Sequence, residues 1–209
     1  MTALYHVPEI HTWGDKLLTE SAVSFNEILD WRPMLSEMRL IKSPNEIRLM
    51  QQAGQITALG HIKAMQTTRP NRFEYEIESD ILHEFNRHCA RFPSYNSIVA
   101  GGSSACILHY TENDRPLNDG DLVLIDAGCE FAMYAGDITR TFPVNGKFSQ
   151  PQREIYELVL KAQKRAIELL VPGNSIKQAN DEVIRIKTQG LVDLGILNGD
   201  VDTLIEQQA

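Results

Sequence analysis

Two aspartates, Asp126 and Asp137, are the feature that most constrains how this chain can fold. The apolar residues 122–125 predict a buried strand with Asp126 at its rim. Residues 138–142, with β-branched and aromatic character, predict a returning strand directly after Asp137. The two carboxylates would then face one another across a hairpin, which is unfavourable unless a divalent cation lies between them. Aspartates at this spacing alone are more often turn caps or solvated than metal ligands, so the flanking residues decide whether this pair binds a metal.

Three short motifs around these aspartates resemble one family of enzymes. They are Ile-Asp-Ala-Gly at residues 125–128, Gly-Asp-Ile-Thr-Arg-Thr-Phe at residues 136–142, and Cys-Ile-Leu-His-Tyr-Thr-Glu-Asn-Asp at residues 106–114. Together they resemble the aminopeptidase P (Xaa-Pro aminopeptidase) members of the pita-bread metallopeptidases, and most of all the bacterial type. The resemblance runs from about Trp31 to the end of the chain.

The resemblance implies a metal-dependent peptidase that releases the N-terminal residue of a peptide with proline in its second position. By motif, Asp126 would bind one metal ion and Asp137 would bridge two, usually manganese, which hold a bridging hydroxide for attack on the scissile carbonyl. His109 would line the pocket and stabilise the carbonyl oxygen as charge develops on it. The resemblance also implies a homo-oligomer in the complete protein.

The fold that the resemblance implies is an α+β, pita-bread fold with the second half of its sheet missing from this chain. We expect residues 1–35 to be the tail of a smaller N-terminal domain and residues 36–209 to be a catalytic domain that is truncated at its C-terminus. The family's other metal ligands, one histidine and two glutamates, would follow Asp137, whereas every histidine here precedes Asp126. We therefore expect these 209 residues alone to be inactive.

Two other functions fit the same motifs. A prolidase or a methionine aminopeptidase shares the paired aspartates, and activity on dipeptides rather than on longer Xaa-Pro peptides would identify a prolidase. The alternative from another class is a non-catalytic peptide-binding pita-bread module. Such modules typically lose the metal ligands, so the presence of both Asp126 and Asp137 argues against it.

Composition restricts the partners and the compartment. The formal net charge is −8 and no basic run occurs, which argues against a nucleic-acid partner. Cys89, Cys106 and Cys129 are widely spaced, which indicates buried thiols in a reducing cytoplasm and not a disulfide framework. Cys129 lies beside the hairpin without a nearby histidine base, so we do not expect it to be a nucleophile. No apolar stretch of about 18 residues and no signal pattern occurs, so we expect no membrane segment and a cytoplasmic location.

Helical periodicity dominates between residues 43 and 91. Ser43, Pro44 and Glu46 predict a capping box that begins a helix, and His61 lies on the apolar stripe of this helix as a packed core residue. A second helix is predicted over about residues 73–91. Its inward side chains would be Ile77, Ile81, Phe85 and Cys89, and its solvated face would carry Glu74, Glu76, Glu78 and Glu84.

Shorter patterns predict the remaining elements. Strands are expected over residues 4–7, 97–100 and 105–110, with a Gly-Gly bend between the last two. Residues 23–29 suggest a helical turn or two, and longer helices are expected over about residues 149–170 and 175–194. Amphipathic helices of this kind need a sheet to cover.

Overall fold

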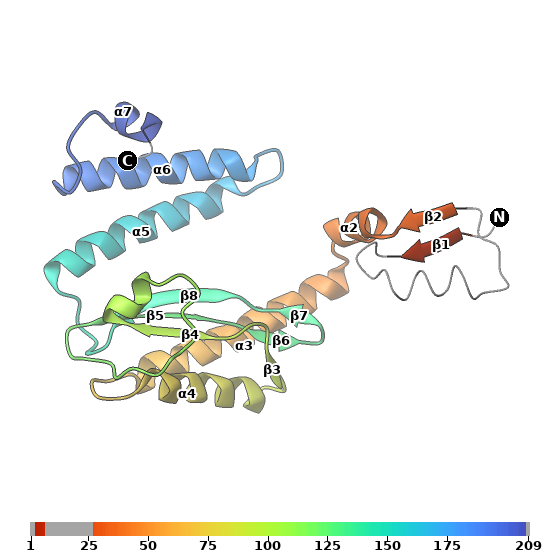
Figure 1. The fold of residues 1–209 in the computed structure, drawn as a ribbon, viewed down its shortest axis with the longest axis horizontal. Helices are drawn as coiled ribbons and strands as arrows, with labels where there is room; N and C mark the ends of the chain where they lie inside the picture. The colour runs from red at the N-terminus through yellow and green to blue at the C-terminus, as the bar shows by residue number, and fades with distance from the viewer. Residues whose placement is uncertain (1–2, 7–26, 208–209) are drawn as a thin grey trace. The chain divides into compact units, whose positions relative to one another are not determined.

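The computed structural model describes residues 3–6 and 27–207 (Figure 1). The chain divides into two compact units that alternate along the sequence. The first unit comprises Met1–Gly60, Leu82–Asn96 and Ala127–Ile138, and the second unit comprises His61–Ile81, Ser97–Asp126 and Thr139–Ala209. The predicted domain division near residue 35 stays a prediction.

The first unit contains two small sheets. Strands β1 (Ala3–His6) and β2 (Glu27–Asp30) pair in parallel, and helix α2 (Arg32–Leu40) follows them. The strand expected at residues 4–7 is confirmed up to residue 6. The helical turn expected at residues 23–29 is wrong for residues 27–29, which lie in β2, while residues 23–26 are outside the described part of the chain.

The other sheet of the first unit is antiparallel, in the order β3-β6-β7. Its strands are β3 (Phe92–Pro93), β6 (Cys129–Phe131) and β7 (Tyr134–Ala135). The residues that join β6 to β7, Ala132 and Met133, have φ angles of 50° and 70°. Two successive residues with positive φ form the tight hairpin turn that matches the twist of antiparallel strands.

Helix α3 (Pro44–Thr67) begins where the sequence predicts. The Ser43 hydroxyl accepts a hydrogen bond from the Glu46 N–H at 3.3 Å, and the Glu46 carboxylate accepts one from the Ser43 N–H at 2.6 Å. This reciprocal pair is the expected capping box. His61 on the stripe of α3 is only 3% exposed, as predicted for a packed core residue.

Helix α4 (Glu74–Arg87) has the predicted apolar face, with Ile77, Ile81 and Phe85 all buried. Two predictions for this helix are wrong. Cys89 is exposed, because the helix ends before it and its φ of 66° turns the chain away. The glutamates do not share one solvated face either: Glu74 is fully buried and Glu84 is 8% exposed.

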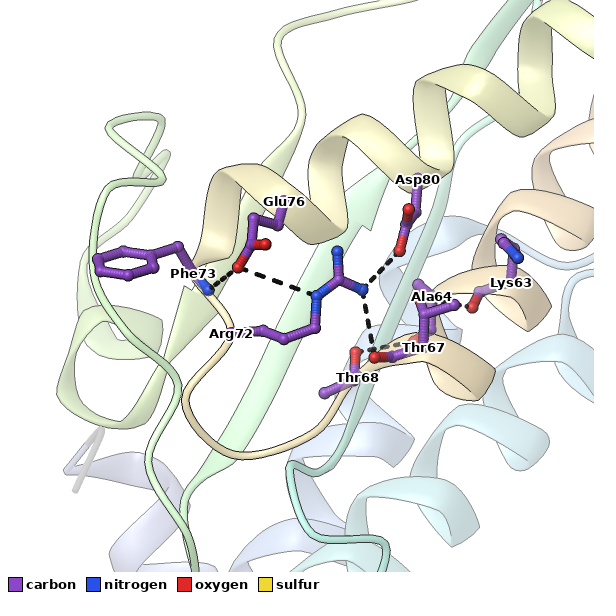
Figure 2. Close-up of polar contacts among 8 residues, drawn as sticks. All are labelled: Lys63, Ala64, Thr67, Thr68, Arg72, Phe73, Glu76 and Asp80. Atoms are coloured by element: carbon purple, nitrogen blue, oxygen red, sulfur yellow. Dashed lines mark hydrogen bonds and ion pairs between the residues drawn. The ribbon is translucent and has the colours of Figure 1, made fainter.

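The turn between α3 and α4 is held by the Arg72 side chain (Figure 2). Its guanidinium donates to Asp80 Oδ2 at 2.6 Å and to the Thr67 carbonyl at 3.2 Å. Glu76 lies 3.9 Å from Arg72 Nε and also accepts a 2.7 Å hydrogen bond from the Phe73 N–H. These contacts join the end of α3 to the first two turns of α4. They therefore fix the position of Glu74, the first residue of α4.

The second unit is built on a three-stranded sheet in the order β4-β5-β8 (Figure 1). Its strands are β4 (Ile98–Gly101), β5 (Leu122–Ala127) and β8 (Ile138–Pro143), so the strands predicted before Asp126 and after Asp137 are confirmed. Strand β4 is antiparallel to β5, with Ile98 opposite Asp126 and Ala100 opposite Leu124. A predicted strand at residues 105–110 is wrong: residues Gly102–Cys106 form a 3-10 helix, η1, and an irregular segment follows.

Three helices complete the second unit. Helix α5 (Gln150–Leu169) and helix α6 (Ile176–Asp193) confirm the two predicted helices, and each begins with a capping box, at Ser149 and Ser175 respectively. They lie side by side, and α7 (Val201–Glu206), which the sequence did not predict, packs on α6 (Figure 1). Within the described residues, no helix is long and apolar enough to cross a membrane.

Candidate active site

Asp126 lies on the exposed side of β5, one residue before the strand ends. Because side chains alternate along a strand, Val123, Ile125 and Ala127 point into the core, and Leu124 and Asp126 point the other way and are half-buried. Ile98 and Ala100 of β4 lie opposite these two residues. The register of β4 and β5 therefore places the Asp126 carboxylate beside an apolar patch on one face of this sheet.

A pocket of about 290 Å³ covers this patch. Its apolar lining includes Ile98, Ala100 and Leu124, which form a cluster with the buried Tyr110. Its titratable lining residues are Cys106, His109 and Asp126, and Thr139 adds a hydroxyl. Small-molecule sites typically combine an apolar wall with a few convergent polar groups. The structure thus brings two of the three predicted site residues into one pocket.

His109 reaches this pocket from the irregular segment that follows η1. Its φ of 56° lies in the left-handed region, which a residue with a Cβ adopts only when its surroundings hold it there. Backbone conformations of this kind cluster at functional sites. The imidazole is exposed and borders the pocket rim, beside Leu108, which is 85% exposed.

Asp137 belongs to the first unit, where it follows β7 and the buried Gly136. The Tyr95 hydroxyl donates a 3.0 Å hydrogen bond to Asp137 Oδ1. The carbonyl of Gly136 accepts from the Ser94 hydroxyl at 2.9 Å, and its N–H donates to the Cys129 carbonyl at 2.8 Å. The backbone on the N-terminal side of Asp137 is therefore fixed, and its carboxylate is oriented by a phenol. That Asp126 and Asp137 face one another stays a prediction.

Cys129 is excluded as a nucleophile by its surroundings. Its Sγ is buried, lies 3.4 Å from the Ala53 carbonyl and 3.5 Å from the Thr57 hydroxyl, and burial raises the pKa of the thiol. A buried thiol with a raised pKa stays protonated and unreactive. The other two cysteines, Cys89 and Cys106, are exposed and not buried as predicted, while all three are free as expected.

Asp126 and Asp137 provide the kind of ligand atom that a divalent cation prefers, but too few of these atoms to complete a metal site. Carboxylate oxygens are the ligands that manganese, magnesium and calcium prefer, but Asp126 and Asp137 supply at most about four of them. In the part of the chain that the structure describes, no group of three or more His, Cys, Asp or Glu side chains could hold a metal ion. Any complete metal centre that uses these aspartates therefore needs further ligands.

A larger hollow of about 670 Å³ lies between α5 and α6, but its chemistry is less specific. Its walls carry both signs of charge, and Arg165 is already paired with Glu168 at 3.1 Å and with Glu182 at 3.4 Å. Exposed pairs of this kind contribute little to stability, and the lining carries three basic and three acidic side chains, so it favours neither sign of ligand charge. The smaller pocket at His109 and Asp126 is the better candidate.

Comparison with known proteins places the chain in a family. Residues 48–199 match the model of metallopeptidase family M24. The chain is 96% identical over 209 residues to a Xaa-Pro aminopeptidase of Haemophilus influenzae, covering 49% of that protein. It is 60% identical over 182 residues to the Xaa-Pro aminopeptidase of Escherichia coli, covering 41% of it. The chain therefore belongs to metallopeptidase family M24.

Solved structures agree with this assignment. A variant of Escherichia coli aminopeptidase P in complex with substrate matches all of the chain with a TM-score of 0.94 and 52% identity, and the match covers 50% of that protein. A zinc-substituted form of the same enzyme, in complex with product, matches equally well. The chain thus has the pita-bread fold of this family and spans about half the length of the relatives that it matches. The expected α+β class is confirmed.

The sequence does not predict the contacts that three side chains make with the site loops. The sequence predicts a solvated face for Glu74 and no particular role for Tyr95 or Asn113, yet each contacts the loops that carry the predicted residues. Asn113 is 2% exposed, and its φ of 49° is the kind of backbone geometry that asparagine tolerates better than most residues. No local pattern reveals such contacts, because their partners are distant in sequence.

Proposed function

We propose that the full-length protein to which this chain contributes is a metal-dependent Xaa-Pro aminopeptidase. The observation that carries the proposal is the pocket that His109 and Asp126 share, in a chain 96% identical to the Haemophilus influenzae Xaa-Pro aminopeptidase. The substrate would be a peptide with proline in its second position, from which the first residue is released. Family membership supports the metal dependence, and the relatives' names support the peptide class.

In this proposal Asp126 and Asp137 would hold two divalent cations together with ligands from the rest of the full-length protein. Bound cations of this kind activate a water molecule and polarise the scissile carbonyl. We propose manganese, because oxygen donors suit it. His109, at the pocket rim, would donate a hydrogen bond to the carbonyl oxygen as negative charge develops there. The apolar wall of Ile98, Ala100 and Leu124 would exclude water from the bound peptide.

The proposal also includes the compartment and the oligomeric state of the full-length protein, and the compartment proposed is the cytoplasm. The three free cysteines are consistent with a reducing cytoplasm. We also propose that the full-length protein is a homo-oligomer, which its sedimentation velocity would test.

Peptide cleavage by the full-length protein tests the proposed specificity. We expect Xaa-Pro-Xaa peptides to be cleaved much faster than matched Xaa-Ala-Xaa peptides. Equal cleavage of both would reject the preference for proline. Faster turnover of the dipeptide Xaa-Pro than of the tripeptide would instead favour a prolidase, and metal-independent binding without cleavage would favour a non-catalytic module.

A further inference from the structure

Glu74 is the most deeply buried acidic side chain among the described residues, and its surroundings satisfy it fully. Its exposure is 0%. Oε1 accepts from the Gly101 N–H at 2.7 Å, and Oε2 accepts from the Tyr110 hydroxyl at 2.8 Å and from the Arg115 N–H at 3.0 Å. A carboxylate is removed from water at high cost unless such donors replace its hydration. These three contacts therefore explain how a glutamate is tolerated here.

The three donors are spaced along one stretch of chain. Gly101 ends β4, Tyr110 directly follows His109, and Arg115 lies five residues beyond Tyr110. A single carboxylate thus holds residues 101–115 at both ends and in the middle. This stretch, which we call the histidine loop, provides the pocket lining from Ala105 to His109.

Backbone bonds fix Glu74 itself to the far end of the histidine loop. The Glu74 N–H donates to the Arg115 carbonyl at 3.0 Å, and the Leu117 N–H donates to the Arg72 carbonyl at 2.8 Å. The Arg72 guanidinium in turn contacts Asp80, which ties this backbone to α4 (Figure 2). The carboxylate is therefore held on a rigid support and does not simply follow the loop.

The histidine loop needs this support because its backbone is strained. His109 and Asn113 have φ angles of 56° and 49°, both left-handed. Asn113 adds a second anchor, since its Oδ1 accepts from the Val99 N–H at 2.9 Å and its Nδ2 donates to the Ser97 carbonyl at 2.9 Å. Residues held in such conformations persist only when neighbouring contacts determine them. Without its anchors the loop would relax, and His109 would leave its place at the pocket.

We propose that Glu74 is the positioning residue for His109: it holds the histidine loop so that the imidazole lies in the pocket with Asp126. The inference rests on the proposed function, which gives His109 its role. The pKa of the Tyr110 phenol is raised by burial and by its hydrogen bond to Glu74, so the phenol stays a donor at neutral pH. Glu74 does not touch the substrate in this account and acts through the loop.

Glu74→Gln isolates this role with a minimal change in shape. An amide has one acceptor oxygen and one donor NH2 group. If the oxygen takes the position of Oε1, the NH2 group faces the Arg115 N–H, and in the opposite orientation it faces the Gly101 N–H. In either orientation a backbone donor loses its acceptor. The loop is loosened at one end although the side-chain volume is unchanged.

The decisive experiment is a double-mutant cycle on kcat in the full-length protein. We expect Glu74→Gln to lower kcat about 10- to 100-fold, less than the 100- to 1,000-fold typical of a lost electrostatic donor, with KM changed less than about 3-fold. In a His109→Ala background the same substitution should lower kcat less than about 2-fold, because the group being positioned is gone. Equal fold losses in both backgrounds, or no loss in either, would overturn the inference.

Two companion variants keep the test interpretable. Glu84→Gln is the matched control: Glu84 is also buried on α4, but its ion-pair partners Arg87 and His88 lie within four residues of it and outside the histidine loop, so kcat should be unchanged. If Glu74→Gln does not fold, Tyr110→Phe removes one donor and leaves the other two contacts of Glu74. It should show a smaller loss of kcat that again disappears in the His109→Ala background.

Amide hydrogen exchange separates this inference from the proposed function. In the Glu74→Gln variant whichever of the Gly101 and Arg115 amides loses its acceptor should exchange at least about 10-fold faster, while the Val99 amide, held by Asn113, should change little. If the unsubstituted protein cleaves no Xaa-Pro peptide, the proposed function fails but this measurement still decides whether Glu74 anchors the loop. Unchanged exchange at both amides would refute the anchoring.

Discussion

Gly136→Ala should destabilise the hairpin that presents Asp137. A Cβ on residue 136 would lie 2.1 Å from Thr57 Oγ1 and 2.8 Å from the Ala53 carbonyl oxygen of α3. Neither neighbour can simply move. The Ala53 atom is a carbonyl oxygen of the helix backbone, and the Thr57 hydroxyl accepts a 3.1 Å hydrogen bond from the Cys129 N–H. The added methyl group must therefore push β7 away from α3 or break this hydrogen bond.

The magnitude follows from these two effects. Overpacking of a well-packed site costs about 1 to 3 kcal/mol, and a lost internal hydrogen bond adds about 0.5 to 1.5 kcal/mol. We expect Gly136→Ala to lower the free energy of unfolding by about 2 to 4 kcal/mol, which in a chain of this size lowers the Tm by roughly 4 to 16 °C. Urea denaturation followed by circular dichroism would measure the change.

Gly54→Ala is the matched control on α3. A Cβ there would meet nothing within 4 Å, and alanine is favoured over glycine in a helix by up to about 1 kcal/mol. This variant should be as stable as the unsubstituted protein or more stable. Thr57→Ala should partly rescue Gly136→Ala, because it removes the hydroxyl in the way. A Gly136→Ala variant with unchanged stability, or strictly additive effects with Thr57→Ala, would refute the reasoning.

Three further predictions concern charge, ligands and catalysis. The Tyr134 hydroxyl, 2.6 Å from Glu46, is the main cause that lowers the pKa of Glu46 from 4.5 to about 2. Stability from this depressed pKa is present above pH 4.5 and lost as the pH falls through about 2, so Tyr134→Phe should destabilise the protein at neutral pH and have a much smaller effect near pH 2 in urea midpoints. The 209-residue chain alone should bind manganese weakly by calorimetry and cleave no Xaa-Pro peptide, and tight binding of two ions would contradict this. In the full-length protein, His109→Ala should lower kcat about 100- to 1,000-fold and leave the metal content unchanged by atomic absorption.

Local chemistry made much of the fold predictable. The start of α3 followed from Ser43, Pro44 and Glu46, because a capping box involves only residues three positions apart. The buried face of α4 followed from the spacing of Ile77, Ile81 and Phe85 in the same way.

Local sequence patterns could not predict contacts between residues that are distant in the sequence. Glu74 resembled its exposed neighbours in sequence, but the donors that permit its burial lie 27, 36 and 41 residues away. The apolar residues 105–110 suggested a strand, yet Leu108 is 85% exposed at the rim of a pocket instead of buried in a sheet. Tyr95 donates to Asp137 across 42 residues, which no periodicity could reveal.

The metal content of the full-length protein tests the central claim most directly. The account predicts two divalent ions per chain in the unsubstituted protein. Asp137→Ala should lose both of them together with all Xaa-Pro cleavage, because in the proposal Asp137 would help to hold both ions. Atomic absorption and a Xaa-Pro peptide assay on the same samples would decide it. An Asp137→Ala protein that keeps two ions and near-normal turnover would contradict the account.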